Sequence, residues 1–287
     1  MQFQPLLEEI VATLRPELGQ AGQVASYIPA LARVPATQLG IALRTCDGEE
    51  AHAGDSTTPF SIQSISKLFT LTLGMREIGE ALWERIGREP SGNAFNSLVQ
   101  LESEHGLPRN PFINAGAIAV TDRLVSVGYA KAEMLALLSS LCGEPVHFDE
   151  EVAASEAATG FRNVALANFM KSFGRIDNDV GAVLDVYFYA CAIRMSCLQL
   201  ARAEALLQEG FVPQRLLTDF HLHEAEDGLA LAARLAAAIA TPLPVLLLLV
   251  MLMLPLLPLL VLLSPGQGRR WLVGGILIGV VLGAVLL

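Results

Sequence analysis

The sequence predicts an α/β protein of the α+β kind, with a short β-hairpin near the start of the chain and a large helical part after it. The run Leu39–Thr45 is typical of a strand, and Asp47-Gly48 is a turn signal of the kind that closes hairpins. From Ser64 to about Glu209 the spacing of apolar residues is mostly helical. With 287 residues the chain can form one large or two modest domains.

The elements are expected in a simple order. A helix is predicted at 5–18, strands near 39–53 and the helical part at 64–210. The Pro108–Pro111 loop and the Gly143–Pro145 turn interrupt the helical part, because proline and glycine break helices.

The composition changes after these elements. Residues 1–217 are assigned to one domain, and an acidic, then alanine- and leucine-rich connection follows at 218–240. The apolar tail, 241–287, contains two stretches without a charge, Thr241–Ser264 and Trp271–Leu287. The first is long enough to span a bilayer and the second only just. One or two membrane helices, and so membrane contact, are expected here; the alternative is that the tail is not a working membrane domain.

Charge and cysteine content narrow the class of protein. The formal charge of −10, without a basic stripe, argues against a nucleic-acid partner. The cysteines Cys46, Cys142, Cys191 and Cys197 form no C-x-x-C pair, and Leu6–Leu14 is an amphipathic helix rather than the apolar core of a signal peptide. We therefore expect a cytoplasmic protein with reduced thiols.

One segment of the sequence contains several residues of the types that bind metal ions. His221 and His223 lie beside Glu224, Glu226 and Asp227. A catalytic zinc needs a third, distant ligand, and no histidine follows this pair. The sequence favours a solvated acidic helix start, and no metal site is predicted.

The main chemical signal is the pair Ser64 and Lys67, in Ser-x-x-Lys spacing at the beginning of an apolar helical run. On a helix, residues three apart share a face. A serine hydroxyl becomes a nucleophile when a base takes its proton, and a lysine with a lowered pKa is such a base. This pattern is typical of Ser-x-x-Lys acylating enzymes. Alone, it also fits a solvated first helical turn rich in capping serines.

Further sequence motifs occur in order along the chain. They are Val24–Ala32, Gly54-Asp55, Pro59–Lys67, Glu89–Gly92, Phe95–Ser97, Pro108–Ile118, Ser155-Glu156, Arg162-Asn163, Met170-Lys171, Tyr187, Cys191, Met195–Cys197 and Leu200–Ala203. Through them the chain resembles, over roughly residues 5–215, the serine-dependent glutaminases. That resemblance implies a β-lactamase and penicillin-binding-protein-like fold with a large helical subdomain.

The resemblance also implies a reaction. It is the hydrolysis of L-glutamine to L-glutamate and ammonia, without a metal or organic cofactor, in a homo-oligomer (dimer or tetramer). Ser64 would be the acylated nucleophile and Lys67 its base. The implied substrate-binding set is Tyr27, Ser64, Asn114, Glu156, Asn163 and Tyr187. Glu156 would pair with the substrate ammonium, the asparagine amides would meet its carboxylate, and Tyr27 would close over the amino acid.

Several of these residues have a structural alternative. Asn114 beside Ala115-Gly116 could satisfy a turn, and Glu156 could be a first-turn helix acid. Tyr187 lies in an aromatic run that is typical of a core. The ordered set as a whole favours the functional interpretation.

The carboxy-terminal part departs from the family. Glutaminases of this type carry a second tyrosine near the nucleophile and a Lys-Ser-Gly-Val-Gly-Gly-Gly strand, and neither feature is present here. We expect apolar helices to replace the carboxy-terminal strands and turnover to be impaired. Two other interpretations stay open: a catalytically dead, membrane-tethered glutaminase-like protein, and a related Ser-x-x-Lys acyltransferase.

Overall fold

The computed structural model describes residues 3–20, 22–45, 47–92, 94–129 and 131–206. The chain divides into two compact units. Of the described residues, those within 3–27, 31–59 and 196–206 form unit 1, and those within Ile28–Ala30 and Phe60–Met195 form unit 2. The expectations for the 218–240 connection and the 241–287 tail lie outside the described residues.

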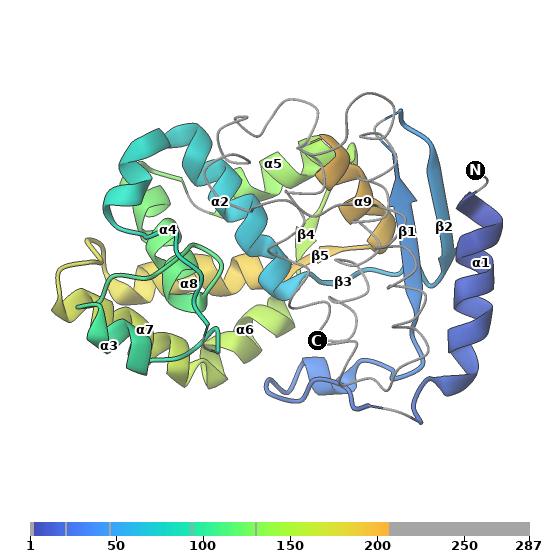
Figure 1. The fold of residues 1–287 in the computed structure, drawn as a ribbon, viewed down its shortest axis with the longest axis horizontal. Helices are drawn as coiled ribbons and strands as arrows, with labels where there is room; N and C mark the ends of the chain where they lie inside the picture. Colours follow the sequence, from blue (N-terminus) through green and yellow to red (C-terminus); the bar gives the residue numbers. More distant parts are fainter. Residues whose placement is uncertain (1–2, 21, 46, 93, 130, 207–287) are drawn as a thin grey trace. The chain divides into compact units, whose positions relative to one another are not determined.

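Unit 1 is built on an antiparallel hairpin (Figure 1). Strand β1 (Gly40–Arg44) pairs along its whole length with β2 (Glu50–Gly54), as the sequence predicted. In the connecting turn the Gly48 N–H donates to the Thr45 carbonyl at 3.0 Å. The φ of Gly48 is 85°, a conformation that glycine adopts without steric cost.

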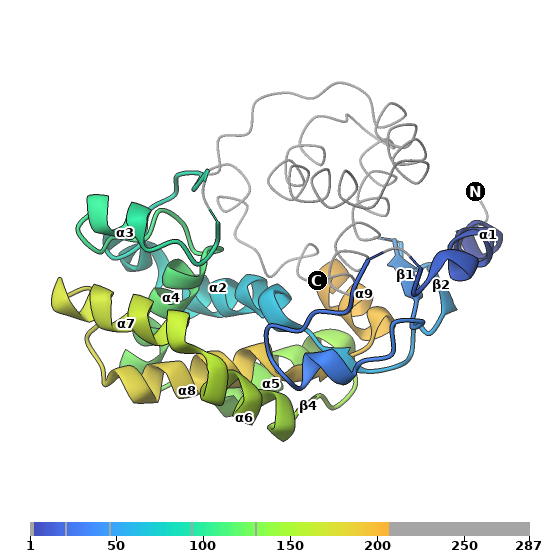
Figure 2. The ribbon, with the colours of Figure 1, turned by 90° about the horizontal axis from the view of Figure 1, so that it is seen from below.

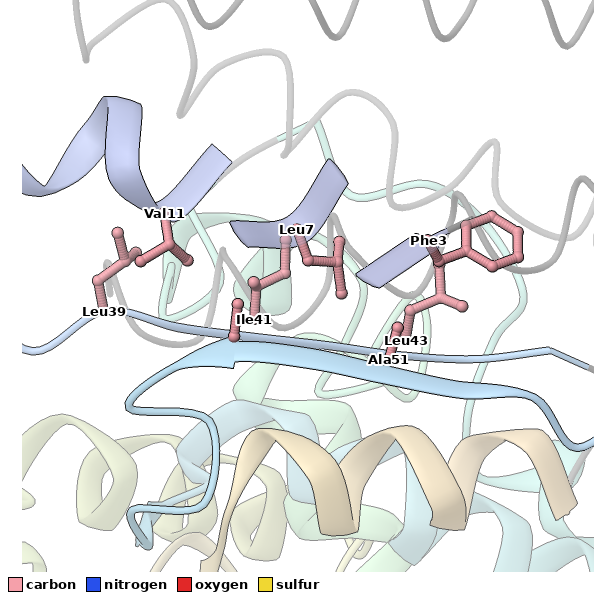
Figure 3. Packing of buried hydrophobic residues seen from close by; sticks show 8 residues of the cluster. Phe3, Leu7, Val11, Leu39, Ile41, Leu43 and Ala51 are labelled. Carbon is pink, nitrogen blue, oxygen red and sulfur yellow. The ribbon is translucent and has the colours of Figure 1, made fainter. Parts of the chain in front are cut away.

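Helices α1 (Phe3–Leu14) and α9 (Cys197–Leu206) lie on opposite faces of this hairpin, as Figure 3 shows. Phe3, Leu7 and Val11 recur every four residues and therefore point from one face of α1 onto the strands. They meet the buried side chains of Leu39, Ile41, Leu43, Ala51 and Ala53. Two short 3₁₀ turns, η1 (Arg15–Glu17) and η2 (Leu31–Arg33), complete the described part of unit 1.

A cluster of charges ties α9 to the hairpin. The Arg202 guanidinium donates from Nε and Nη2 to both carboxylate oxygens of Glu50, each at 2.9 Å, and Arg44 Nη1 donates to the same carboxylate at 2.8 Å. Bidentate arginine–carboxylate pairs fix orientation as well as distance. The cluster therefore holds α9 in one register on the strands.

Unit 2 is mainly helical (Figure 2). Its elements are β3 (Phe60–Ser61), η3 (Gln63–Ile65), α2 (Ser66–Glu77), η4 (Gly79–Glu84), α3 (Val99–Ser103), α4 (Asn114–Ser126), α5 (Lys131–Cys142), β4 (His147–Phe148), α6 (Glu150–Thr159), α7 (Phe161–Ser172), α8 (Val180–Cys191) and β5 (Ile193–Met195). The three short strands form an antiparallel sheet in the order β3-β5-β4. No single described helix is long and apolar enough to cross a bilayer; α4 and α5 meet that test only as a pair, across a 104° bend.

Helix α4 is the centre of unit 2, buried on most of its surface and packed against α2, α7 and α8. Its first turn is made of small residues because a loop lies directly against it. A Cβ on Gly116 would stand 1.8 Å from the Asn110 carbonyl oxygen, so only glycine allows this approach. The Asn110 side chain accepts the N–H groups of Phe112 and Ile113, which turns the chain into the helix. Asn114 is thereby fixed as the first residue of α4.

The far end of α4 is held by a buried carboxylate. Asp122 is fully buried, and its carboxylate accepts the backbone N–H groups of Asp177 and Asn178 and the Asn178 amide, at 2.9 to 3.2 Å. These residues connect α7 to α8. One side chain therefore fixes the loop between two helices that pack on α4.

Replacing Asp122 with alanine is expected to lower the free energy of unfolding by about 3–5 kcal/mol, because it leaves buried N–H donors without an acceptor. Denaturant titration followed by circular dichroism measures the loss. The matched control is Asp185→Ala. Asp185 makes an exposed ion pair with Lys131 at 2.7 Å, so its removal should cost no more than about 1 kcal/mol. A larger loss at Asp185 than at Asp122 would contradict this account of the loop.

Candidate active site

Ser64 lies in a tight turn directly ahead of helix α2. The sequence placed Ser64 and Lys67 on one helix, but only Lys67 is in the α-helix, which begins at Ser66; Ser64 belongs to the 3₁₀ turn η3. The reason is Gln63, whose φ of 48° interrupts the chain between β3 and the helix. As a result the Ser64 side chain is exposed, whereas Lys67 one turn later is buried.

Asn114 holds the buried lysine, and Asn163 in turn holds Asn114. Lys67 Nζ donates to Asn114 Oδ1 at 2.7 Å, and Asn114 Nδ2 donates to Asn163 Oδ1 at 3.0 Å. The lysine ammonium also lies over the Phe95 ring, 5.5 Å from its centroid, and the Phe95 carbonyl accepts the Asn114 N–H at 2.8 Å. Side chains from α2, α4 and α7 thus form one connected chain.

The environment of Lys67 favours its neutral form. Burial lowers the pKa of Lys67 to about 8, against the opposing effects of Cys191 and Glu156. No carboxylate of the described residues comes within 4.0 Å of this ammonium. A lysine with this pKa supplies a substantial neutral fraction near pH 8 and can accept a proton from a neighbouring hydroxyl.

Glu156 is a second buried charge in the same part of unit 2. Burial raises the pKa of its carboxyl to about 7, while a hydrogen bond with Gln63 and the charge of Lys67 lower it. Glu156 lies in the second half of α6, so the alternative of a first-turn helix acid is wrong. A carboxylate in this position can receive a cation, and pairing with one would restore its negative charge.

Tyr187 and Cys191 come from α8, one helical turn apart, and both are buried. Burial raises the pKa of the Cys191 thiol to about 12, although hydrogen bonds with Ser66 and Tyr187 oppose the rise. The thiol is therefore neutral at ordinary pH. It contributes a compact, weakly polar surface beside Lys67 and Glu156.

The structure thus brings Lys67, Asn114 and Asn163 into direct contact, with Glu156 in electrostatic contact with Lys67. Asn114 binds the lysine rather than a turn, so that alternative for it is wrong. Tyr27 is exposed and belongs to unit 1.

Sequence reasoning gave no role to Gln63, Phe95 or Cys191. All of them lie within the strings that carried the resemblance, and Gln63 is the residue before the nucleophile. Their contacts depend on the meeting of segments distant in sequence, which spacing alone does not reveal.

The described residues contain no group of three or more His, Cys, Asp or Glu side chains that could hold a metal ion. The thiols of Cys142, Cys191 and Cys197 are buried and take part in no disulfide within the described part of the chain. Cys46, His221 and His223 lie outside the described residues.

Comparison with known sequences gives a consistent answer. The Glutaminase family model matches residues 22–226. A glutaminase of Azorhizobium caulinodans is 55% identical over 206 residues, which cover 69% of this chain and 67% of the relative. A glutaminase of Rhodopseudomonas palustris is 57% identical over 210 residues, covering 70% of this chain and 67% of the relative.

Solved structures agree with the sequence matches. The probable glutaminase ybaS has a TM-score of 0.63 at 36% identity, over 71% of this chain and 68% of the other. A native Mglu crystal structure has a TM-score of 0.65 at 34% identity, but the match covers only 49% of that chain. A probable glutaminase from Bacillus subtilis, complexed with 6-diazo-5-oxo-L-norleucine, has a TM-score of 0.61 at 31% identity, over 71% of this chain and 63% of the other. The described part of the chain therefore has the β-lactamase-like fold of these structures, and the chain belongs to the glutaminase family, hydrolases that act on linear amides.

Proposed function

We propose that this chain hydrolyses L-glutamine to L-glutamate and ammonia through a γ-glutamyl ester of Ser64. The observation that carries the proposal is the buried Lys67, held by Asn114 and with a lowered pKa, one turn after an exposed serine. Membership of the glutaminase family supports the choice of substrate.

In the first step neutral Lys67 Nζ takes the proton of Ser64 Oγ as the oxygen attacks the side-chain amide carbon of glutamine. Collapse of the tetrahedral intermediate breaks the carbon–nitrogen bond, and the lysine returns the proton to the departing ammonia. Water then attacks the ester with Lys67 again as base, and releases glutamate and free Ser64. Asn114 keeps the amine in place throughout.

The substrate is held by its two charged groups. Glu156 pairs with the ammonium, and asparagine amides meet the carboxylate. This role suits Asn163 better than Asn114, because Asn114 Nδ2 already donates to Asn163 Oδ1. Tyr187 lines the site from α8.

Replacing Glu156 with glutamine is expected to raise KM for glutamine by at least about tenfold, with a smaller effect on kcat, because it removes one partner of a desolvated charge contact. Steady-state ammonia release measures both constants. Asparagine should be a poor substrate of the unchanged chain, since a missing methylene moves the amide from Ser64 by more than about 1 Å. An unchanged KM in Glu156→Gln would show that the ammonium binds elsewhere.

The tail belongs to the same proposal. We propose that apolar helices within 241–287 replace the family's carboxy-terminal strands, that they bring the otherwise cytoplasmic chain to a membrane, and that turnover is lower than in the relatives. Support comes from the end of the family match at residue 226 and from the uncharged stretches beyond it. A homo-oligomer is proposed from family membership alone.

The discriminating experiment assays the full chain for ammonia release from glutamine and for labelling by a fluorescent penicillin, with membrane and soluble fractions separated. Glutamine hydrolysis supports the proposal. Penicillin labelling without hydrolysis indicates the related acyltransferase, and a membrane-bound chain with neither reaction indicates a catalytically dead, tethered protein.

A further inference from the structure

Two of the sequence motifs named above meet in unit 2 through a hydrogen bond. The Ala30 N–H, in the motif Val24–Ala32, donates to Ser155 Oγ, in the motif Ser155-Glu156, at 3.3 Å. The two residues are 125 positions apart in the sequence, and the bond is partly buried. The proposed reaction gives Ser155 no role, although it directly precedes Glu156 on α6.

The segment Ile28–Ala30 differs from the chain on both sides of it. It belongs to unit 2, whereas the residues next to it, Tyr27 and Leu31, belong to unit 1. Ile28 is 3% exposed, while Tyr27, directly before it, is 62% exposed. Full burial of an isoleucine side chain contributes about 1.5–3 kcal/mol, so Ile28 supplies an apolar anchor for the segment. The hydrogen bond to Ser155 adds a directional one.

Ser155 uses its hydroxyl differently from other hydroxyls in the helices of unit 2. Inside a helix, serine and threonine side chains often hydrogen-bond to the carbonyl three or four residues earlier. Thr121, Ser126 and Thr159 do so here, each donating to the carbonyl four residues before it. Ser155 instead accepts a hydrogen bond from a distant segment. Its hydroxyl therefore joins that segment to α6, one residue before Glu156.

We infer that Ser155 is a positioning residue: it holds Ile28–Ala30 on α6 beside Glu156 and so keeps water from the site that receives the substrate ammonium. The inference rests on the proposed function, in which Glu156 binds that ammonium. Ser155 takes no part in bond making or breaking.

Exclusion of water from Glu156 matters for the affinity of this site. Glu156 is 6% exposed, and burial raises the pKa of its carboxyl to about 7. A carboxylate in such a place attracts an ammonium more strongly than it does in water, because fewer solvent dipoles screen the two charges. A segment fixed on the same helix preserves this environment, whereas a loosened segment admits water. Loss of the Ser155 contact should therefore weaken substrate binding.

The test uses the full chain with Ser155→Ala. We expect the backbone amide of Ala30 to exchange its hydrogen about tenfold faster, measured by hydrogen–deuterium exchange with mass spectrometry, because the amide loses its acceptor. KM for glutamine should rise about threefold to tenfold, the effect of one hydrogen bond. The change in kcat should stay within about twofold, since the lost contact acts on binding and not on the bond-breaking step. Ser155→Thr, which keeps a hydroxyl, should restore both the amide protection and KM.

The matched control is Ser139→Ala. Ser139 on α5 also accepts a backbone N–H, that of Val146 at 3.1 Å, but this bond holds the turn that leads to β4. The two variants lose similar hydrogen bonds, so their melting temperatures should fall by similar amounts. In Ser139→Ala, KM and the exchange at Ala30 should stay as they are. L-Glutamate binding, measured by titration calorimetry, does not need turnover and should weaken in Ser155→Ala by the same factor as KM rises.

The outcomes separate this inference from the proposed function. If Glu156→Gln weakens binding while Ser155→Ala leaves KM and the glutamate affinity as they were, the inference is overturned and the proposed function stands. An equal rise in KM in Ser139→Ala would also overturn it, since the effect would then reflect general stability. Restored amide protection in Ser155→Thr without a restored KM would overturn it as well. An unmodified chain that neither hydrolyses glutamine nor binds glutamate overturns both.

Discussion

Replacing Ser64 with alanine is expected to abolish glutamine hydrolysis, lowering kcat by at least about 10⁴-fold, because the acyl group then has no oxygen to bind. Ser64 is exposed in η3, so its hydroxyl fills no core space. The circular dichroism spectrum and melting temperature should therefore stay as they are. Ammonia release from saturating glutamine is the measurement.

Ser66→Ala is the matched control. Ser66 is buried, forms the first residue of α2 and is hydrogen-bonded to the Cys191 thiol, and it therefore tests whether any serine of this turn matters. Loss of a weak hydrogen bond should cost less than about tenfold in kcat. Equal losses at the two serines, or turnover that survives in Ser64→Ala, would remove Ser64 from the role of nucleophile.

Replacing Lys67 with methionine should be nearly as damaging as Ser64→Ala. The double variant should be no worse than either single one, because the two groups act as a unit. In the unmodified chain kcat/KM should rise with pH through about 8, since the lysine must be neutral to accept a proton and burial sets its pKa there. The residual rate of Lys67→Met should lack this dependence.

The same substitution should leave stability unchanged or raise it. Lys67 is buried with Asn114 as its hydrogen-bond partner, and methionine replaces a desolvated amine with an apolar chain of similar length. Steady-state kinetics over a range of pH tests the expected loss of turnover, and thermal melts test the expected stability. A large fall in melting temperature with turnover retained would mean that the lysine serves the fold and not the reaction.

Much of the fold could be predicted because its signals are local. Asp47-Gly48 marked the hairpin, and the Pro108–Pro111 and Gly143–Pro145 segments interrupt the helices where the sequence indicated. The short strands β4 and β5 could not be found, since two or three residues carry no periodicity and the pairing joins segments far apart in the chain. The packing of α1 and α9 on the two faces of the hairpin also joins segments far apart in the chain, so it could not be predicted either.

The candidate site residues could be chosen from the sequence by type and order, but their contacts could not be predicted. The spacing of Ser64 and Lys67 suggested a shared helix face, whereas the positive φ of Gln63 places the serine in a separate turn. Asn114 is predicted to meet substrate, and its hydrogen bonds with Lys67 and Asn163 could not be read from the sequence. The depressed pKa of Lys67 depends on burial by several elements of unit 2, which no local string encodes.

The most direct test of the Ser64–Lys67 mechanism is covalent labelling of the full chain with 6-diazo-5-oxo-L-norleucine, the compound present in the Bacillus subtilis structure. Peptide mapping by mass spectrometry then locates the adduct. The account predicts a single adduct on Ser64 that excess glutamate suppresses, that forms faster as pH rises toward 8, and that is lost in Ser64→Ala and strongly slowed in Lys67→Met. An adduct on any other residue, or labelling of Ser64 at an unchanged rate in Lys67→Met, would contradict it.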